Sequence, residues 1–163
     1  MAGGQGLITA GVGYSANRSR LEADVLAGYV PRKYSITAMG IFTAKITYIP
    51  WSIPLGGAGW ALRPLALGGY VNYTASRGLN TSRDSKYDKD YYWWSSHTRL
   101  GGFVGGRITY PLPRRQSAKP RRHASLYYEL GSNDLYIVSW WHNPRTLSLN
   151  DVLTLGVGIK LDL

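Results

Sequence analysis

The chain has 163 residues, which is the length of about one domain and enough to bury a core without a metal or disulfide. It has no cysteine, which excludes a disulfide scaffold, a cysteine zinc site and an iron–sulfur cluster. Charged residues make up 17% of the chain, below the roughly 25% of ordinary soluble domains, and its 20 glycines and 13 tyrosines favour a β protein. The net charge of +10 suggests an acidic partner, such as nucleic acid or an anionic lipid.

The main pattern along the chain is an alternation of apolar and polar residues with a period of two, which is typical of β-strands. It is clearest in residues 151–163, where aliphatic side chains occupy one face and small or charged residues the other. Residues 60–76 contain Pro64 and an apolar run, and residues 135–142 are apolar on both faces, so alternation does not define these two segments, which are still counted as strands. Residues 131–134 are expected to form a hairpin connection. In chain order the sequence predicts eight strands, at 6–15, 20–30, 34–49, 60–74, 92–111, 124–131, 134–142 and 151–163.

Most of these segments have ten residues or more, whereas strands of soluble proteins usually have about 5–6. A strand that crosses a membrane needs about 9–11 residues, and about eight strands make the smallest common closed outer-membrane barrels. No run of 18 apolar residues occurs, so no membrane-spanning helix is expected. The sequence predicts one all-β domain over 1–163, an eight-stranded antiparallel transmembrane β-barrel with both termini in the periplasm.

Charged residues inside the predicted strands lie opposite the apolar face. In a closed barrel this face points inward, where opposite charges can pair. The predicted lumen charge network comprises Glu22, Asp24, Lys45, Arg99, Arg107, Glu129, Lys160 and Asp162. Arg63, near the start of the fourth strand, does not fit this pattern and is expected at a membrane interface.

The remaining charges lie in connections and at strand ends, with the densest basic cluster between the fifth and sixth strands. Its members are Arg114, Arg115, Lys119, Arg121 and Arg122. Counted from a periplasmic N-terminus, this connection is extracellular, while the long 76–90 connection falls on the periplasmic side. We expect the basic cluster to contact phosphates of lipopolysaccharide or an acidic partner surface. The alternative is a solvated loop without a partner.

Aromatic residues also gather towards the strand ends, as at Tyr29, Tyr48, Trp51 and 91–94. Amphipathic rings at both rims form the interfacial girdles of membrane barrels. Aromatic pairs across the strands of a soluble barrel would give a similar pattern.

Several stretches resemble small outer-membrane barrels of Bacteroidota, a group without an established activity. They are GYVPRKY at 28–34, TYIPW at 47–51, YYWWSS at 91–96, YYELGSNDLY at 127–136 and LSLNDVL at 147–153. The resemblance implies an outer-membrane location and a barrel fold. The C-terminal Leu163 departs from many outer-membrane barrels, in which an aromatic residue is common there.

Candidate chemistry is sparse. Lipid A deacylase barrels carry a His-x-Ser pair with a nearby acid, and His123 and Ser125 match that spacing, with Glu129 further along. No motif for a metal or another cofactor occurs, and no nucleic-acid-binding module is recognisable.

We therefore expect an integral outer-membrane protein with a structural or interaction role, as an accessory subunit or lipid-embedded scaffold. Its expected partners are outer-membrane lipid, lipopolysaccharide and other outer-membrane proteins, without nucleic acid. The alternatives are a lipid A-modifying hydrolase and a soluble lipocalin-like carrier.

Overall fold

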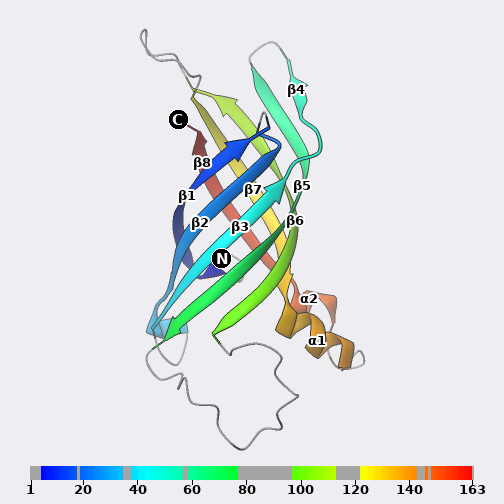
Figure 1. The fold of residues 1–163 in the computed structure, drawn as a ribbon. Coiled ribbons are helices and arrows are strands. Elements are labelled where there is room, and N and C mark those ends of the chain that lie inside the picture. Colours follow the sequence, from blue (N-terminus) through cyan, green and yellow to red (C-terminus); the bar gives the residue numbers. More distant parts are fainter. Residues whose placement is uncertain are drawn as a thin grey trace, which may run out of the picture.

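A computed structural model describes residues 5–17, 19–34, 38–56, 59–76, 97–112, 122–142, 146 and 148–162. Seven long strands form one curled antiparallel sheet in the order β1-β2-β3-β5-β6-β7-β8 (Figure 1). Their bounds are β1 (Ile8–Ala16), β2 (Leu21–Val30), β3 (Met39–Tyr48), β5 (Trp60–Ser76), β6 (Thr98–Pro111), β7 (His123–Asn133) and β8 (Thr154–Asp162). A short strand, β4 (Ile53–Leu55), pairs with the beginning of β5. The prediction of an all-β antiparallel fold is confirmed.

The alternation seen in the sequence sets which side chains face the concave side of this sheet. In β2, Glu22 and Asp24 are buried, while their neighbours Ala23 and Val25 are exposed. The register carries this face across the sheet, since Asp24 lies opposite Gly13 of β1 and Lys45 of β3. The charged residues of the strands thus point into the curl, and most of the large aliphatic residues point away from it.

The predicted strand at 134–142 is wrong, because this segment forms the helix α1 (Asp134–His142). Residues 131–133 continue β7 instead of turning into a hairpin. The Asn133 side chain accepts a hydrogen bond from the Tyr136 backbone N–H (3.0 Å), and Asp134 accepts one from Leu135 (2.8 Å). Asparagine and aspartate stabilise helix starts in this way, by pairing amides that have no partner within the helix.

A second short helix, α2 (Leu149–Val152), precedes β8 and occupies the first two residues of the strand predicted at 151–163. The Ser148 backbone N–H and hydroxyl both donate to the Asp151 carboxylate, at 2.9 and 2.8 Å, and these bonds lower the pKa of Asp151. A 3-10 turn, η2 (Arg32–Tyr34), connects β2 to β3. None of the helices in the described ranges is long and apolar enough to cross a membrane.

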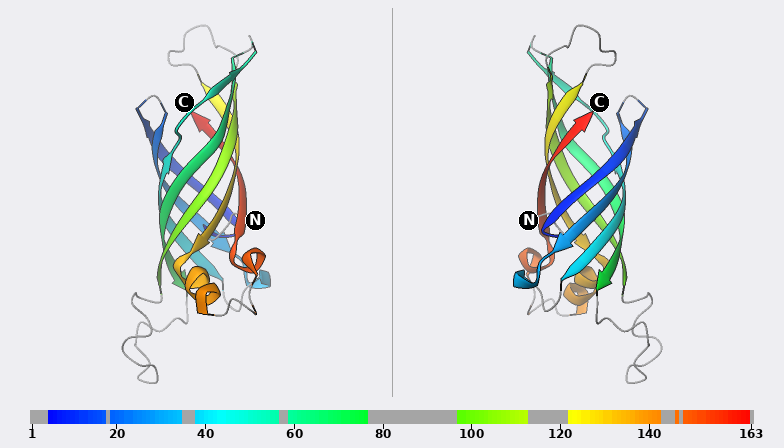
Figure 2. Two further views of the ribbon diagram at one scale, coloured as in Figure 1. Left: turned by 90° about the vertical axis from the view of Figure 1, so that its right-hand side faces the viewer. Right: turned by 90° about the vertical axis from the view of Figure 1, so that its left-hand side faces the viewer.

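The loss of one predicted long strand changes the topology. Six successive antiparallel pairings separate β1 from β8, so these two strands run in the same direction. Figure 2 shows the beginning of β1 and the end of β8 towards opposite ends of the sheet. The expectation that both termini lie on one side is therefore wrong. The 76–90 connection lies outside the described residues, apart from Ser76 at the end of β5.

The edges of the sheet are not joined by a ladder among the described residues, because no pairing links β1 to β8. The sheet is a curled half-barrel of seven long strands, and closure into an eight-stranded barrel is not shown. Both helices lie near the end of the sheet where β7 finishes and β8 begins (Figure 2).

Two glycines of β6 test the assignment of faces. Gly105 is buried between Ala66 and Glu129 of the adjacent strands, and an added methyl carbon would overlap the backbone carbonyl oxygen of Tyr128. At the exposed Gly102, the nearest atom would be the Gly68 carbonyl oxygen, 3.6 Å away, which is ordinary contact. We expect Gly105→Ala to lower the free energy of unfolding by about 1–3 kcal/mol, the usual cost of overpacking. Gly102→Ala should leave it unchanged in the same urea titration, and equal effects would contradict the assignment.

Candidate functional site

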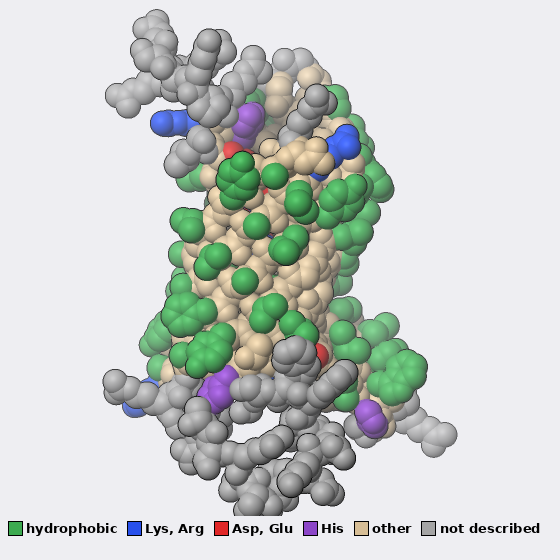
Figure 3. Space-filling view, viewed as in Figure 1, with side chains coloured by type: hydrophobic (Ala, Val, Ile, Leu, Met, Phe, Trp, Pro, Cys, Tyr) green, Lys and Arg blue, Asp and Glu red, His purple; other side chains and the backbone are tan. Residues whose placement is uncertain are grey.

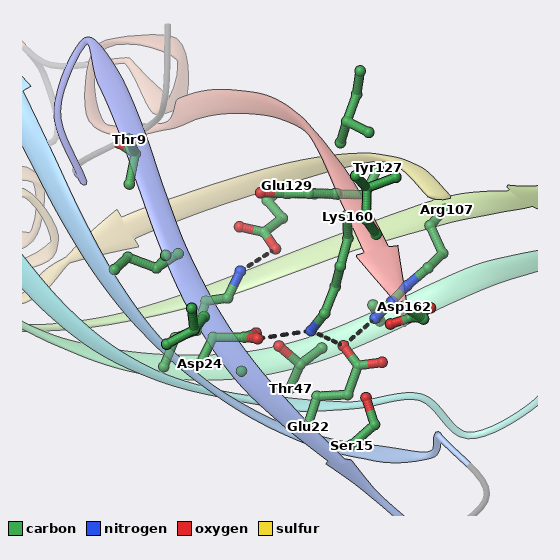
Figure 4. Close-up of a pocket in the computed structure, with 18 of the residues that line it drawn as sticks. Thr9, Ser15, Glu22, Asp24, Thr47, Arg107, Tyr127, Glu129, Lys160 and Asp162 are labelled. Atoms are coloured by element: carbon green, nitrogen blue, oxygen red, sulfur yellow. Dashed lines mark hydrogen bonds and ion pairs between the residues drawn. The ribbon is translucent and has the colours of Figure 1, made fainter. Parts of the chain in front are cut away.

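A cluster of charged side chains surrounds the carboxylate of Glu22 on β2, and the Glu22 side chain is only 2% exposed. Arg107 of β6 donates from Nη2 to Glu22 Oε2 at 2.6 Å, and Lys160 of β8 donates to the same oxygen at 2.9 Å. Arg63 of β5 places Nη1 at 4.0 Å from Oε1, which is an ion pair without a hydrogen bond. One carboxylate therefore links four strands across the concave face. Figure 4 shows its contacts with Arg107 and Lys160.

Lys160 joins this group to a second acid. Its ammonium donates to Asp24 Oδ1 at 2.7 Å as well as to Glu22. Glu22 and Asp24 are two residues apart on one strand, so their side chains share a face and one lysine can reach both. These contacts hold β8 against β2, although the two strands are not neighbours in the sheet.

A separate pair joins β3 to β7. Lys45 donates to Glu129 Oε1 at 2.6 Å, and the Lys45 side chain is only 5% exposed. Its ammonium also lies 5.1 Å from the ring centroid of Phe103 and 5.3 Å from that of Tyr127. Such contacts with the ring faces are favourable for a desolvated cation.

These charges line a cavity of about 790 Å³ on the concave side of the sheet. Glu22, Asp24, Lys45, Arg107, Glu129 and Lys160 all contribute to its wall. Three buried atoms of the charged group, Glu22 Oε1, Arg63 Nη1 and Arg107 Nη1, have no hydrogen-bond partner among the described residues. The cavity therefore has a mixed wall, in which the ion pairs lie beside apolar residues such as Leu26 and still have hydrogen-bonding capacity.

A second group of inward side chains is neutral. Thr43 donates to Asn72 Oδ1 at 2.7 Å, and the Tyr70 hydroxyl donates to the Ser132 carbonyl at 3.3 Å. The Ser132 hydroxyl in turn donates to the carbonyl of Val152 in α2, at 2.8 Å. This group ties the sheet to the helical end of the fold, and it closes part of the interior with hydrogen bonds and an aromatic pair between Tyr70 and Phe103.

Six members of the predicted lumen charge network are brought together by the structure. They are Glu22, Asp24, Lys45, Arg107, Glu129 and Lys160. Asp162 lines the same cavity, and Arg99 is half-buried opposite Asn72, but neither makes an ion pair with another described residue.

Arg63 belongs to this group, contrary to the expectation that it lies at a membrane interface. It sits opposite Arg107 in the register, and a β-bulge between Arg63 and Ala66 shifts the alternation at this point. Pro64 lies within the bulge, where a missing backbone N–H is tolerated. Strict period-two alternation, counted through the bulge, would place Arg63 on the outer face of the sheet. Pro64 is the residue in the sequence that indicates a break in the alternation at this point.

The weak catalytic candidates are not arranged as a catalytic group. Ser125 is fully buried, and its hydroxyl is hydrogen-bonded to that of Thr109 at 2.9 Å. Glu129 is held by Lys45, and no hydrogen bond joins His123 to Ser125 or Glu129 within the described ranges. The described residues also contain no group of three or more His, Cys, Asp or Glu placed to hold a metal ion.

Most of the basic cluster cannot be placed. Arg114, Arg115, Lys119 and Arg121 lie outside the described residues, while Arg122 is exposed just before β7.

No protein-family model, no curated protein and no solved structure matches the chain.

The Lys45–Glu129 pair allows a direct test of the charged interior. Lys45→Met should lower the free energy of unfolding by about 1–3 kcal/mol, because Glu129, whose side chain is 16% exposed, then loses its ion-pair and hydrogen-bond partner. The double variant Lys45→Met with Glu129→Gln should recover most of this loss, since no unpaired charge remains. Chemical unfolding of all four members of the cycle measures the coupling. If the effects of the two substitutions on the free energy of unfolding are additive, the ion pair is hydrated and contributes nothing to stability.

Proposed function

We propose that the protein is an integral β-barrel of the bacterial outer membrane with a structural or interaction role, as a lipid-embedded scaffold or an accessory subunit. The observation that carries this proposal is an inverted distribution of side chains. The buried residues include Glu22, Asp24, Lys45, Asn72 and Arg107, whereas large aliphatic residues of all seven long strands are exposed. Soluble proteins bury their aliphatic residues and expose their charges.

The outer surface of the sheet fits contact with lipid. Figure 3 shows hydrophobic side chains spread over the visible face of the sheet, with Lys, Arg, Asp, Glu and His only towards its two ends. Exposed aromatic residues lie near strand ends, as with Tyr29, Tyr48 and Trp60, and Trp60 packs edge-on against Tyr110 at 4.8 Å between ring centroids. An apolar band bordered by aromatic rings is the usual outer surface of a membrane barrel.

The helix α1 favours an interaction role. It exposes Leu135, Ile137, Val138 and Trp141, which are 41–75% exposed, at one end of the sheet. An apolar helix in this position suits the lipid–water interface or a partner protein. Together with the lipopolysaccharide contact expected of the basic cluster, it supports a membrane-embedded binding scaffold.

The alternative functions have less support. A lipid A hydrolase would need an accessible nucleophile, whereas Ser125 has no exposed surface and is hydrogen-bonded to Thr109. A soluble carrier would have to leave the outer aliphatic residues in water, although its cavity would be compatible with a ligand.

The membrane proposal predicts that the purified protein requires detergent. We expect a β-type circular dichroism spectrum and migration in SDS gels that changes on heating, since a barrel protected by detergent resists unfolding until heated. A monomer that stays soluble without detergent and has the same spectrum would overturn the membrane proposal in favour of the carrier.

A matched pair of arginine substitutions tests the lipid-facing surface. Val25 lies in the middle of β2 and is 62% exposed, and Leu149 lies on α2 and is 56% exposed. In lipid vesicles, Val25→Arg should cost about 2–4 kcal/mol of folding free energy if it lies near the bilayer midplane, and Leu149→Arg about 0–1. Equal costs, measured by urea titration of folding into vesicles, would contradict a membrane-facing β2.

A further inference from the structure

The helix α1 lacks the buried face that normally stabilises a short helix. It contacts β6, β7 and α2, yet none of its nine residues is buried. Isolated helices shorter than about 12–15 residues are marginal in water, and in proteins most of their stability comes from packing an apolar face. The helix therefore needs a further surface that covers its apolar side chains.

The uncovered side of α1 is aliphatic and aromatic. Leu135, Val138 and Trp141 follow one another at a spacing of three residues, which places them on one side of the helix, and they are 41%, 53% and 75% exposed. Ser139 and Trp140 are half-buried. Figure 3 shows hydrophobic side chains gathered at the helical end of the molecule, beside those of the sheet.

The backbone groups at both ends of α1 have partners within the chain. At the start, Asn133 and Asp134 accept hydrogen bonds from the backbone N–H groups of Tyr136 and Leu135. At the end, the His142 ring donates from Nδ1 to the Val138 carbonyl at 2.9 Å. Helix ends otherwise depend on water for such partners, and burying them unpaired is costly. The paired ends lower the cost of moving α1 out of water.

We propose that α1 is an interfacial anchor, whose outward side inserts into lipid at the border of the membrane-spanning sheet. This inference rests on the proposed function and deepens it, because it assigns lipid, and not a partner protein, as the surface that covers α1. Tryptophan and tyrosine are enriched at membrane interfaces, where an amphipathic ring meets both lipid and water. Trp141, the most exposed large side chain of α1, fits this environment.

Continuity with the sheet favours lipid over a protein partner. Asn133, the residue before α1, lies opposite Gly101 of β6, and the adjacent Leu100 is on the outer face, 38% exposed. Leu155 of β8, at the same end of the sheet, is 54% exposed. The apolar side of α1 thus extends the outer surface that the proposed function places in lipid. One solvent, the bilayer, covers both.

The attraction of α1 to the membrane should be hydrophobic and not electrostatic. The helix has no Lys or Arg, and Asp134, its only acidic residue, is at its first position. Anionic lipids attract basic residues, and salt screens that attraction. Insertion of α1 should therefore be the same in zwitterionic and anionic membranes and at low and high salt, unlike the lipid contact expected of the basic cluster.

The experiment measures the depth of single positions in a bilayer and uses the absence of native cysteine. Val138→Cys and Leu135→Cys place a thiol on the outward side of α1, and Asn150→Cys places one on α2, at an exposed polar residue of the same end. Val25→Cys, in the middle of β2, reports on the sheet. Each thiol carries a small fluorophore, and the protein is folded into phosphatidylcholine vesicles.

Two quenchers are compared, nitroxide groups at known depths on lipid chains and iodide in the water. We expect labels at 135 and 138 to lie about 5–10 Å into the boundary between headgroups and acyl chains, the usual depth of an interfacial helix. They should be quenched by shallow nitroxides and protected from iodide. The label at 150 should be quenched by iodide, and the label at 25 by the deeper nitroxides. Added phosphatidylglycerol or salt should not shift the depth at 138.

Three results would overturn the proposal. Iodide might quench positions 135 and 138 as strongly as 150, which would place α1 in water. Both quenchers might fail at 135 and 138, which would mean that protein covers the helix. A depth at 138 that depends on salt or anionic lipid would contradict hydrophobic insertion. In each case, quenching at 25 by deep nitroxides would leave the membrane proposal standing, whereas its absence would overturn the membrane proposal itself.

Discussion

The curl of the sheet depends on charge neutralisation around Glu22. Its carboxylate accepts hydrogen bonds from Arg107 and Lys160, which come from strands on the far side of the concave face. Flattening the sheet would separate these cations from the carboxylate and break the charge-assisted hydrogen bonds between them. The ion pairs therefore favour the curled sheet over a flat one, and they fix which strands face one another across the interior.

The curl in turn determines the outer surface. Once the charged residues of the strands occupy the concave side, period-two alternation places most aliphatic residues on the convex side. In water this large apolar surface would promote aggregation, whereas in a bilayer it would contact lipid. The charged interior and the apolar exterior are thus two consequences of the same alternation.

The faces of the strands could be predicted from the sequence because alternation is a local property. The segment 134–142 could not be assigned by this rule, since it is apolar on both faces. Residues 131–134 were interpreted as a hairpin turn, whereas the side chains of Asn133 and Asp134 accept hydrogen bonds that start the helix. Arg63 was misplaced because the bulge beside Pro64 breaks the alternation. Local rules hold along each strand until an irregular backbone interrupts them.

The partners within the charged interior could not be predicted, although its members could. Lys160 and Glu22 are 138 residues apart in the chain, and their contact exists only after all seven long strands have curled together. The number of long strands also could not be predicted from the alternation of apolar and polar residues, because segment 134–142 does not alternate and forms a helix. Since one predicted strand is a helix, the parity of the strand order changes, and β1 and β8 run in the same direction.

The most direct test of the account is the accessibility of spin labels placed at each residue of β2 in lipid vesicles. The account predicts a period of two, with high oxygen accessibility at Ala23, Val25 and Ala27, and low oxygen accessibility at Asp24 and Gly28, which lie on the buried face. A water-soluble nickel reagent should be excluded from the first set. Accessibility to the nickel reagent at Val25 and its outward neighbours, or no alternation along the strand, would contradict the claim that the convex face of the sheet contacts lipid.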